Sequence, residues 1–93
     1  MYDLFETDEF LKGIEKLQKN DKVLIKNKLN EYVYPQLKSE PHFGTNIKKL
    51  KGYSTDTWRY RAGNYRIFYT VDETDHLVLL LVVESRAKAY RKN

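Results

Sequence analysis

The sequence contains no cysteine, and it has only two prolines and four glycines. The absence of cysteine excludes disulfide bonds and thiol chemistry, and it favours a cytoplasmic location. No charged segment followed by an apolar one marks a signal peptide, and the longest apolar run, residues 77–83, is too short to cross a bilayer. We therefore expect a cytoplasmic protein that does not enter a membrane.

Most catalytic templates are also absent. There is no glycine-rich phosphate-binding loop and no dinucleotide-binding fingerprint, and no serine has an identifiable base. His42 and His76 are far apart in the sequence, and no metal-ligand spacing surrounds either of them. We interpret both as ordinary surface residues, and we expect neither a metal ion nor a cofactor.

Positive charge is present, and it is gathered in one region. The formal net charge of the 93 residues is +4. Residues 1–40 and 71–93 are nearly balanced, whereas residues 41–70 contain six basic side chains and one acidic side chain. Such a region favours nucleic acid or an acidic protein as a partner, and the alternative is a solvated basic surface. The length fits a single domain, residues 1–93, with one modest core.

Two alternating runs within residues 57–71 flank Gly63-Asn64 and predict an antiparallel β-hairpin. Glycine at the first central position favours a type II′ turn, and a two-residue turn fixes the register. One face then carries Arg59, Arg61, Arg66 and Phe68, and the core face carries Trp58, Tyr60, Ile67 and Tyr69. Arg61 lies directly opposite Arg66, and like charges in that position destabilise a sheet. This pairing indicates a polyanion as the partner.

The remaining pattern predicts an α+β fold with the order β-α-α-β-β-β. Residues 2–6 form a first strand, and Thr7 caps a helix with an apolar stripe. Residues 47–52 form a short strand or a turn, and the apolar run of residues 76–84 forms a central strand. We expect a helical hairpin on one face of a small, mainly antiparallel sheet, with the arginines on the other face.

The second helix of that hairpin is expected to begin at an Asp21 cap, after a break at Asn20. Pro35 should bend or end it near Tyr34. Its buried stripe would consist of Ile25, Leu29, Tyr32, Val33 and Leu37. We interpret its lysines as a solvated helix surface.

The available chemistry therefore consists of arginine, lysine and tyrosine near one sheet face. Arginine binds phosphate bidentately and stabilises charge that develops during phosphoryl transfer. Aromatic side chains stack on unpaired bases, and Phe68 is the aromatic residue on the arginine side of the hairpin. RNA also supplies its own nucleophile, the 2′-hydroxyl, so this inventory is compatible with RNA cleavage without a metal ion.

Three segments resemble the RelE/ParE toxin superfamily. They are the hairpin motif of residues 58–69, the basic segment of residues 48–52, and residues 85–90 after the apolar strand. The resemblance implies a RelE-like, microbial ribonuclease-like fold and a toxin that a cognate antitoxin neutralises. RelE-like members cut mRNA in the ribosomal A site, whereas ParE-like members poison DNA gyrase.

The resemblance also implies roles for individual residues. The catalytic group would consist of Arg61, Arg66, Arg86 and Tyr90. RNA contacts would come from Lys49, Lys51, Arg59 and Phe68. Arg66 matches the arginine that contacts the scissile phosphate, and Tyr90 matches a C-terminal tyrosine that orients the substrate base.

Two departures from the family pattern affect proton transfer. Many relatives have Gly-His-Arg where this chain has Glu84-Ser85-Arg86, so a histidine acid or base is absent. Two hairpin lysines of some RelE-like enzymes are arginines here, and arginine donates a proton poorly. Proton transfer would then use Tyr90, Glu84, Lys49 or a ribosomal group.

We expect a metal-independent mRNA endonuclease that inhibits translation, with the ribosome, mRNA and an antitoxin as partners. The antitoxin complex would also bind operator DNA. Two alternatives remain at this stage: a ParE-like toxin that binds gyrase without nuclease activity, and a degenerate relative that binds only an antitoxin. Arg66 could also pair with Glu84 on a neighbouring strand, and Tyr90 could simply cover the sheet edge.

Overall fold

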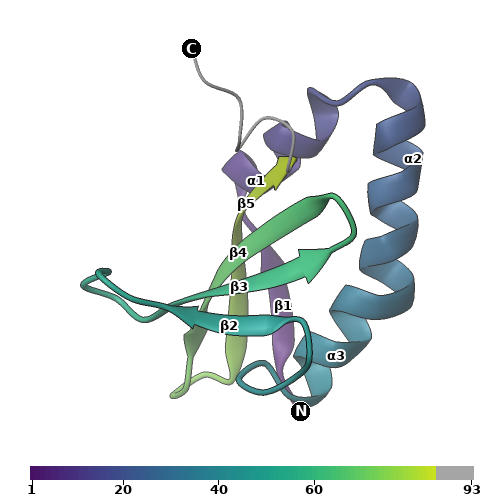
Figure 1. Ribbon diagram of the computed structural model, residues 1–93. Coiled ribbons are helices and arrows are strands. Elements are labelled where there is room, and N and C mark those ends of the chain that lie inside the picture. The colour runs from purple at the N-terminus through teal and green to yellow at the C-terminus, as the bar shows by residue number, and fades with distance from the viewer. Residues whose placement is uncertain (86–93) are drawn as a thin grey trace.

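The computed structural model describes residues 1–85, in which helices cover one face of a five-stranded sheet (Figure 1). The sheet consists of β1 (Asp3–Glu6), β2 (Ile47–Leu50), β3 (Thr57–Ala62), β4 (Tyr65–Asp72) and β5 (Leu77–Ser85). The helices are α1 (Asp8–Glu15), α2 (Lys19–Lys28), the π-helical turn η1 (Leu29–Val33) and α3 (Tyr34–Ser39). The predicted α+β class, with helices on one face of a mainly antiparallel sheet, is confirmed.

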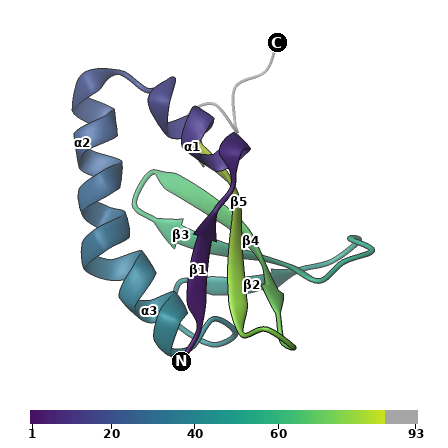
Figure 2. The same ribbon diagram turned by 180° about the vertical axis from the view of Figure 1, so that it is seen from behind.

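The strands lie in the order β1-β5-β4-β3-β2, so β5 has a neighbouring strand on each side, as predicted for an interior strand, and β4 is the middle strand. β1 is parallel to β5, and every other neighbouring pair is antiparallel. Seen from behind, β1 runs beside β5, although they come from the two ends of the described chain (Figure 2). Residues 47–50, which the sequence left between strand and turn, form the edge strand β2.

The register of the β3–β4 hairpin is the one that the turn predicts. Arg61 is opposite Arg66, and Arg59 is opposite Phe68. Gly63 has a φ of 61°, and Asn64 is not among the residues with positive φ. A positive φ at the first central position alone is what a type II′ turn requires.

A β-bulge changes which side chains of β5 face the helices. Phe68 pairs with Val82 and Tyr69 pairs with Leu80, so Leu81 is the extra residue. Before the bulge, Val78 and Leu80 are buried in the core, whereas after it Val83 packs against the core. Strict alternation would have turned residue 84 inward, and the bulge instead turns Glu84 to the face that carries Arg66.

The first helix begins as the sequence predicts. The Thr7 hydroxyl accepts a hydrogen bond from the backbone N–H of Phe10 at 3.3 Å, and it donates one to the carbonyl of Leu80 at 2.6 Å. The same side chain therefore caps α1 and ties that helix to β5. Phe10 and Ile14 are buried against the sheet, and Leu17 packs at the margin of the core.

The second helix begins three residues earlier than predicted, and Asp21 is not its cap. The helix starts at Lys19, with Gln18 in the cap position and no side-chain cap hydrogen bond. Asp21 instead lies in the first turn, where its charge favours the positive end of the helix dipole. Its negative charge is also close enough to Tyr65 of β4 to raise the pKa of that phenol, after the larger effect of burial.

Pro35 changes the helix without ending it. Pro35 has no N–H, so it cannot donate a helical hydrogen bond. Just before it, the backbone hydrogen bonds change from the α-helical to the π-helical pattern in η1, where the N–H of Tyr34 donates to the carbonyl of Leu29. The helix then continues as α3 to Ser39. The extra residue in the turn rotates the apolar stripe, so Leu29, Val33 and Leu37 are buried while Tyr32 is 61% exposed. The prediction of a buried Tyr32 was wrong for this reason.

The core lies between the helices and the inner face of the sheet. Phe10, Ile25 and Leu37 come from the helices, and Ile67 and Tyr69 come from β4. The hydroxyl of the buried Tyr69 donates a hydrogen bond to the carbonyl of Pro41 at 2.7 Å. None of the helices within residues 1–85 is long and apolar enough to cross a membrane.

Candidate nucleic-acid interface

The sheet face opposite the helices carries the predicted arginines, and we call Arg59, Arg61 and Arg66 the arginine face. Their neighbours Tyr60 and Ile67 point into the core, so the pleat turns the three guanidinium groups away from the helices. Arg61 is exposed, and the other two are half-buried. The structure thus brings together the three hairpin arginines that the sequence singled out.

The charges of the arginine face act on one another. Partial burial lowers the pKa of Arg59, and the positive charges of Arg61 and then Arg66 lower it further. Within residues 1–85, neither Arg59 nor Arg61 forms an ion pair. The register places Glu84 of β5 opposite Arg66, so one carboxylate lies beside the cationic group. This face would attract a polyanion, and phosphate is an anion that arginine binds well.

A shallow groove beside the arginines contains the predicted stacking residue. Its volume is about 350 Å³, and it is lined by Tyr53, Thr57, Phe68, Leu81, Val82 and Glu84. Phe68 is half-buried, and its position opposite Arg59 puts its ring next to a cation. An apolar groove beside arginines is suited to a base whose phosphate is held by those arginines.

The lysines of the basic segment lie on different sides of the sheet. Lys48 is opposite Arg59 and therefore belongs to the arginine side of β2. Lys49 is opposite Trp58, its ammonium is 5.8 Å from the centre of that ring, and it is 3.2 Å from the carboxylate of Asp56. The structure does not bring Lys49 to the arginine face.

The sequence prediction named Lys49 and not Lys48 for this face. Which of the two lysines lies on the arginine side depends on the β2–β3 register, and no tight turn fixes that register. Lys51 is exposed and follows the end of β2 at Leu50. Arg86 and Tyr90 lie outside the described residues, so their roles stay predictions. The roles of Arg61, Arg66, Lys51 and the other predicted site residues are predictions as well.

His42 is not the ordinary surface residue that the sequence suggested. Its Nδ1 is 3.0 Å from Oε2 of Glu40, and its Nε2 is 2.5 Å from Oε2 of Glu73. Glu73 also accepts a hydrogen bond of 2.9 Å from the hydroxyl of Tyr2. We call these four residues the His42 clamp, since they join the loop after α3 to the β4–β5 turn and to the residue before β1. His76, in contrast, is exposed.

The clamp changes the pKa of its carboxyl groups. The backbone N–H of His42 is the main cause that lowers the pKa of Glu40, and the His42 ring adds to it. The His42 ring and then the Tyr2 hydroxyl lower the pKa of Glu73. No group of three or more His, Asp or Glu side chains that could hold a metal ion occurs in residues 1–85.

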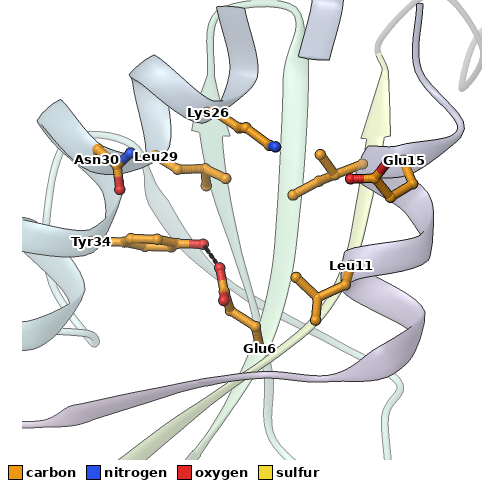
Figure 3. A pocket seen from close by; sticks show the side chains of 8 residues that line it. Glu6, Leu11, Glu15, Lys26, Leu29, Asn30 and Tyr34 are labelled. Atoms are coloured by element: carbon orange, nitrogen blue, oxygen red, sulfur yellow. Dashed lines mark hydrogen bonds between the residues drawn. The ribbon is translucent and has the colours of Figure 1, made fainter. Parts of the chain in front are cut away.

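A second hollow lies between the helices, on the side away from the arginine face (Figure 3). Its volume is about 280 Å³. The residues that line it include Glu6 from β1, Leu11 from α1 and Tyr34 from α3, which are labelled in Figure 3. The Tyr34 hydroxyl donates a hydrogen bond of 2.5 Å to Oε2 of Glu6. Burial, with this carboxylate as a second cause, raises the pKa of Tyr34, so the phenol stays protonated.

A family model and several solved structures match this chain. A family model described as the ParE toxin of the type II toxin–antitoxin system parDE matches residues 5–90. A comparison with curated proteins gave no match.

Solved structures with a similar fold include toxins in complex with antitoxins. In the RelBE2 toxin–antitoxin complex of Mycobacterium tuberculosis, the similar chain is 25% identical, with a TM-score of 0.71 over 91% of this chain and 98% of that chain. In the intact RelBE complex of Escherichia coli, it is 26% identical, with a TM-score of 0.63 over 91% and 96%. The YoeB/ParE toxin of Agrobacterium tumefaciens, at 21% identity and a TM-score of 0.71 over 89% and 96%, shares the fold.

Proposed function

This chain belongs to the RelE/ParE toxin superfamily of type II toxin–antitoxin systems, and we propose that it is a ribosome-dependent mRNA endonuclease. The observation that carries the proposal is the arginine face, where three cations lie together on an open sheet surface. The core does not need these charges, and opposing Arg61 and Arg66 across a strand pair costs stability. A phosphate group offsets that cost and explains the placement.

The proposed chemistry uses the nucleophile that RNA contains. The 2′-hydroxyl attacks the adjacent phosphorus, the bond from phosphorus to the 5′-oxygen breaks, and a cyclic phosphate and a free 5′-hydroxyl result. Negative charge grows on the phosphate oxygens, and Arg61 and Arg66 would stabilise it by charge-assisted hydrogen bonds. This stabilisation is electrostatic and positional, so it requires no covalent intermediate on the protein.

The proposed cleavage also requires two proton transfers. One proton must leave the 2′-hydroxyl, and one must reach the departing 5′-oxygen. Of the candidates Glu84 and Lys49, only Glu84 shares a face with Arg66, because Lys49 pairs with Asp56 on the other side. We propose that Glu84 accepts the first proton and that a ribosomal group or Tyr90 supplies the second.

An antitoxin partner is the second part of the proposal. Similar chains have been solved as toxin–antitoxin complexes from a bacterium and an archaeon, Mycobacterium tuberculosis and Methanococcus jannaschii. A face suited to phosphate also attracts carboxylates, so an acidic amphipathic segment of the antitoxin would cover the arginine face. Apolar anchors are also required, and the groove beside Phe68 provides a place for one.

Induction of the protein in growing cells tests the proposal. We expect growth arrest with cleaved mRNA and intact chromosomal DNA, and rescue when the adjacent small open reading frame is co-expressed. The partner should co-purify with the toxin. DNA damage without mRNA cleavage would instead indicate a toxin that acts on gyrase, and a harmless protein that still binds its partner would indicate a degenerate relative. Either result overturns the endonuclease proposal.

A further inference from the structure

A second pair of like charges lies on the sheet face that carries the arginines. Lys48 of β2 is directly opposite Arg59 of β3, so the pleat turns both side chains away from the helices. The first pair, Arg61 and Arg66, lies between β3 and β4. Like charges at directly opposed positions destabilise a sheet, and here the arrangement occurs twice on one face. A ligand with two negative charges would offset both repulsions.

Lys49, the next residue along β2, has partners within the protein. Its ammonium is 3.2 Å from the carboxylate of Asp56 and 5.8 Å from the centre of the Trp58 ring. Lys48 is exposed, and within residues 1–85 it forms neither an ion pair nor a contact with a ring. The fold therefore uses the charge of Lys49, whereas the charge of Lys48 is open to a ligand beside Arg59.

The two pairs lie on a diagonal across the sheet. Arg59 and Arg61 are two residues apart on β3, which corresponds to about 6.8 Å along the strand. Lys48 and Arg66 lie on the strands to either side of β3, each about 4.8 Å from it. The centres of the two pairs are therefore about 8 Å apart, along a line from β4 to the edge strand β2 (Figure 1). Long, flexible side chains on this line can reach two neighbouring phosphates of one extended strand.

We propose that Lys48 and Arg59 form a second phosphate-binding subsite, which holds the RNA phosphate next to the one at Arg61 and Arg66. The proposal rests on the proposed function, because it takes Arg61 and Arg66 as the place of the scissile phosphate. The RNA strand then crosses the sheet from β4 to β2. A row of cations that follows the backbone is the way in which proteins hold a single strand without reading its sequence.

Binding of a single-stranded RNA octamer tests the subsite without requiring cleavage. The probe is fluorescent and carries 2′-O-methyl groups, which remove the nucleophile. We expect Lys48→Gln to reduce the slope of log affinity against log salt by about 0.7, the value for one phosphate contact on a single strand. The same contact corresponds to binding that is about fourfold weaker at 0.15 M salt. Lys48→Arg should bind like the wild type, since it keeps the charge.

Lys48→Glu separates a role in binding from a role in the fold. A glutamate opposite Arg59 replaces a repulsion by an attraction, so the thermal midpoint should stay the same or rise. The same carboxylate neutralises Arg59 and repels the RNA, so the salt slope should fall by about 1.4. A lysine with only a structural role would lower stability and binding together, and that result would overturn the proposal.

Lys49→Gln is the matched comparison, because it removes the same charge from the next residue, on the opposite side of β2. Lys26→Gln removes a charge from α2, in the layer of helices. Both variants should keep the salt slope of the wild type. A loss of slope in Lys49→Gln equal to that in Lys48→Gln would show a response to net charge alone, and it would overturn the subsite.

The remaining outcomes separate the subsite from the proposed function. Wild-type octamer binding by Lys48→Gln, with loss of mRNA cleavage in Arg66→Ala, would overturn the subsite and leave the endonuclease proposal intact. Dependence of octamer binding on Lys48 in a protein that cuts no mRNA would support the subsite alone. Weaker antitoxin binding by Lys48→Gln, with unchanged octamer binding, would assign the pair to a protein partner and overturn the subsite. A wild type that binds no octamer at low salt would overturn it as well.

Discussion

At the scale of single residues, Arg66 has the most informative surroundings. It lies on β4 between Arg61 of β3 and Glu84 of β5, at directly opposed positions in both ladders. Like charges opposite one another cost about 0.2–1 kcal/mol, and an opposite charge returns a similar amount. The charges of Arg61 and Glu84 therefore act on Arg66 with opposite sign and largely cancel.

Replacement of Arg66 by alanine should abolish toxicity and preserve the fold. Loss of one donor to a developing oxyanion typically lowers the rate by about 10²–10³. The thermal midpoint should change little, since the repulsion with Arg61 and the attraction to Glu84 are lost together. Growth inhibition at equal expression measures the first effect, and a thermal melt measures the second.

The control for that experiment is Lys16→Ala, which removes one positive charge at the end of α1, on an exposed residue away from the arginine face. It should remain fully toxic. Wild-type toxicity in Arg66→Ala, with the two proteins at the same level, would show that Arg66 does not contact the scissile phosphate.

At the scale of elements, the hairpin was predictable, and the second helix was predictable only in part. The register of β3 and β4 follows from the two-residue turn at Gly63-Asn64, so the positions of the arginines could be worked out from local chemistry. The start of α2 could not be placed from the sequence, because Gln18 holds the cap position without a side-chain cap hydrogen bond. The exposure of Tyr32 depends on how the helical hydrogen bonds rearrange around Pro35. The π-helical turn is one of several ways in which a helix can accommodate a proline.

The bulge in β5 was not predictable, because the run Leu77–Val83 is apolar on both faces and contains no signal for an extra residue. Its effect is large, since it decides which face Glu84 occupies. The β4–β5 turn, residues 73–76, fixes the start of the pairing but not the bulge farther along the strands. The side of β2 on which Lys49 lies is a similar case, because the loop of residues 51–56 does not fix the β2–β3 register.

The His42 clamp gives the fold a dependence on pH in the acid range. The pKa values of Glu40 and Glu73 are lowered in the folded state, so their contribution to stability is complete above the usual glutamate pKa of 4.5. This stabilisation is lost as the pH falls below 4.5 and passes through the lower pKa values that Glu40 and Glu73 have in the folded protein. His42→Ala removes the main side-chain cause at Glu73 and should make the loss of stability with acid shallower.

Denaturant titrations at a series of pH values, for the wild type and for His42→Ala, measure this difference. His76→Ala is the matched control, because His76 is the last of the causes acting on Glu73 and should leave most of the acid dependence in place. Identical slopes of stability against pH for the wild type and His42→Ala would exclude the clamp as the cause.

At the scale of the whole molecule, Glu84 is the one carboxylate within residues 1–85 that the register places beside Arg66 on the proposed active face. His42 lies in the clamp instead, between Glu40 and Glu73. General acid–base catalysis typically contributes about 10²–10⁴ in rate. With Glu84 proposed as the base, the acid has to come from the ribosome that holds the substrate or from Tyr90.

Purified protein should therefore cut free RNA at least about a hundredfold more slowly than mRNA on ribosomes. Gel analysis of an end-labelled mRNA, with and without ribosomes, measures the ratio. EDTA should not change the ribosomal reaction. Rapid cleavage of naked RNA that EDTA abolishes would point to a metal-dependent mechanism and contradict the one proposed here.

The pairing of β1 with β5 has a consequence for how the protein matures during its own synthesis. Residues 3–6 leave the ribosome early, but their partner strand, residues 77–85, is made more than seventy residues later. Until then β4 also lacks one neighbour, and Arg66 lacks the strand that carries Glu84. Pairings this distant in sequence form slowly, because the intervening chain must close first. A nascent chain that has not reached residue 77 consequently has the three arginines but lacks the strand that places Glu84 beside Arg66, so the proposed site is incomplete until β5 has been added.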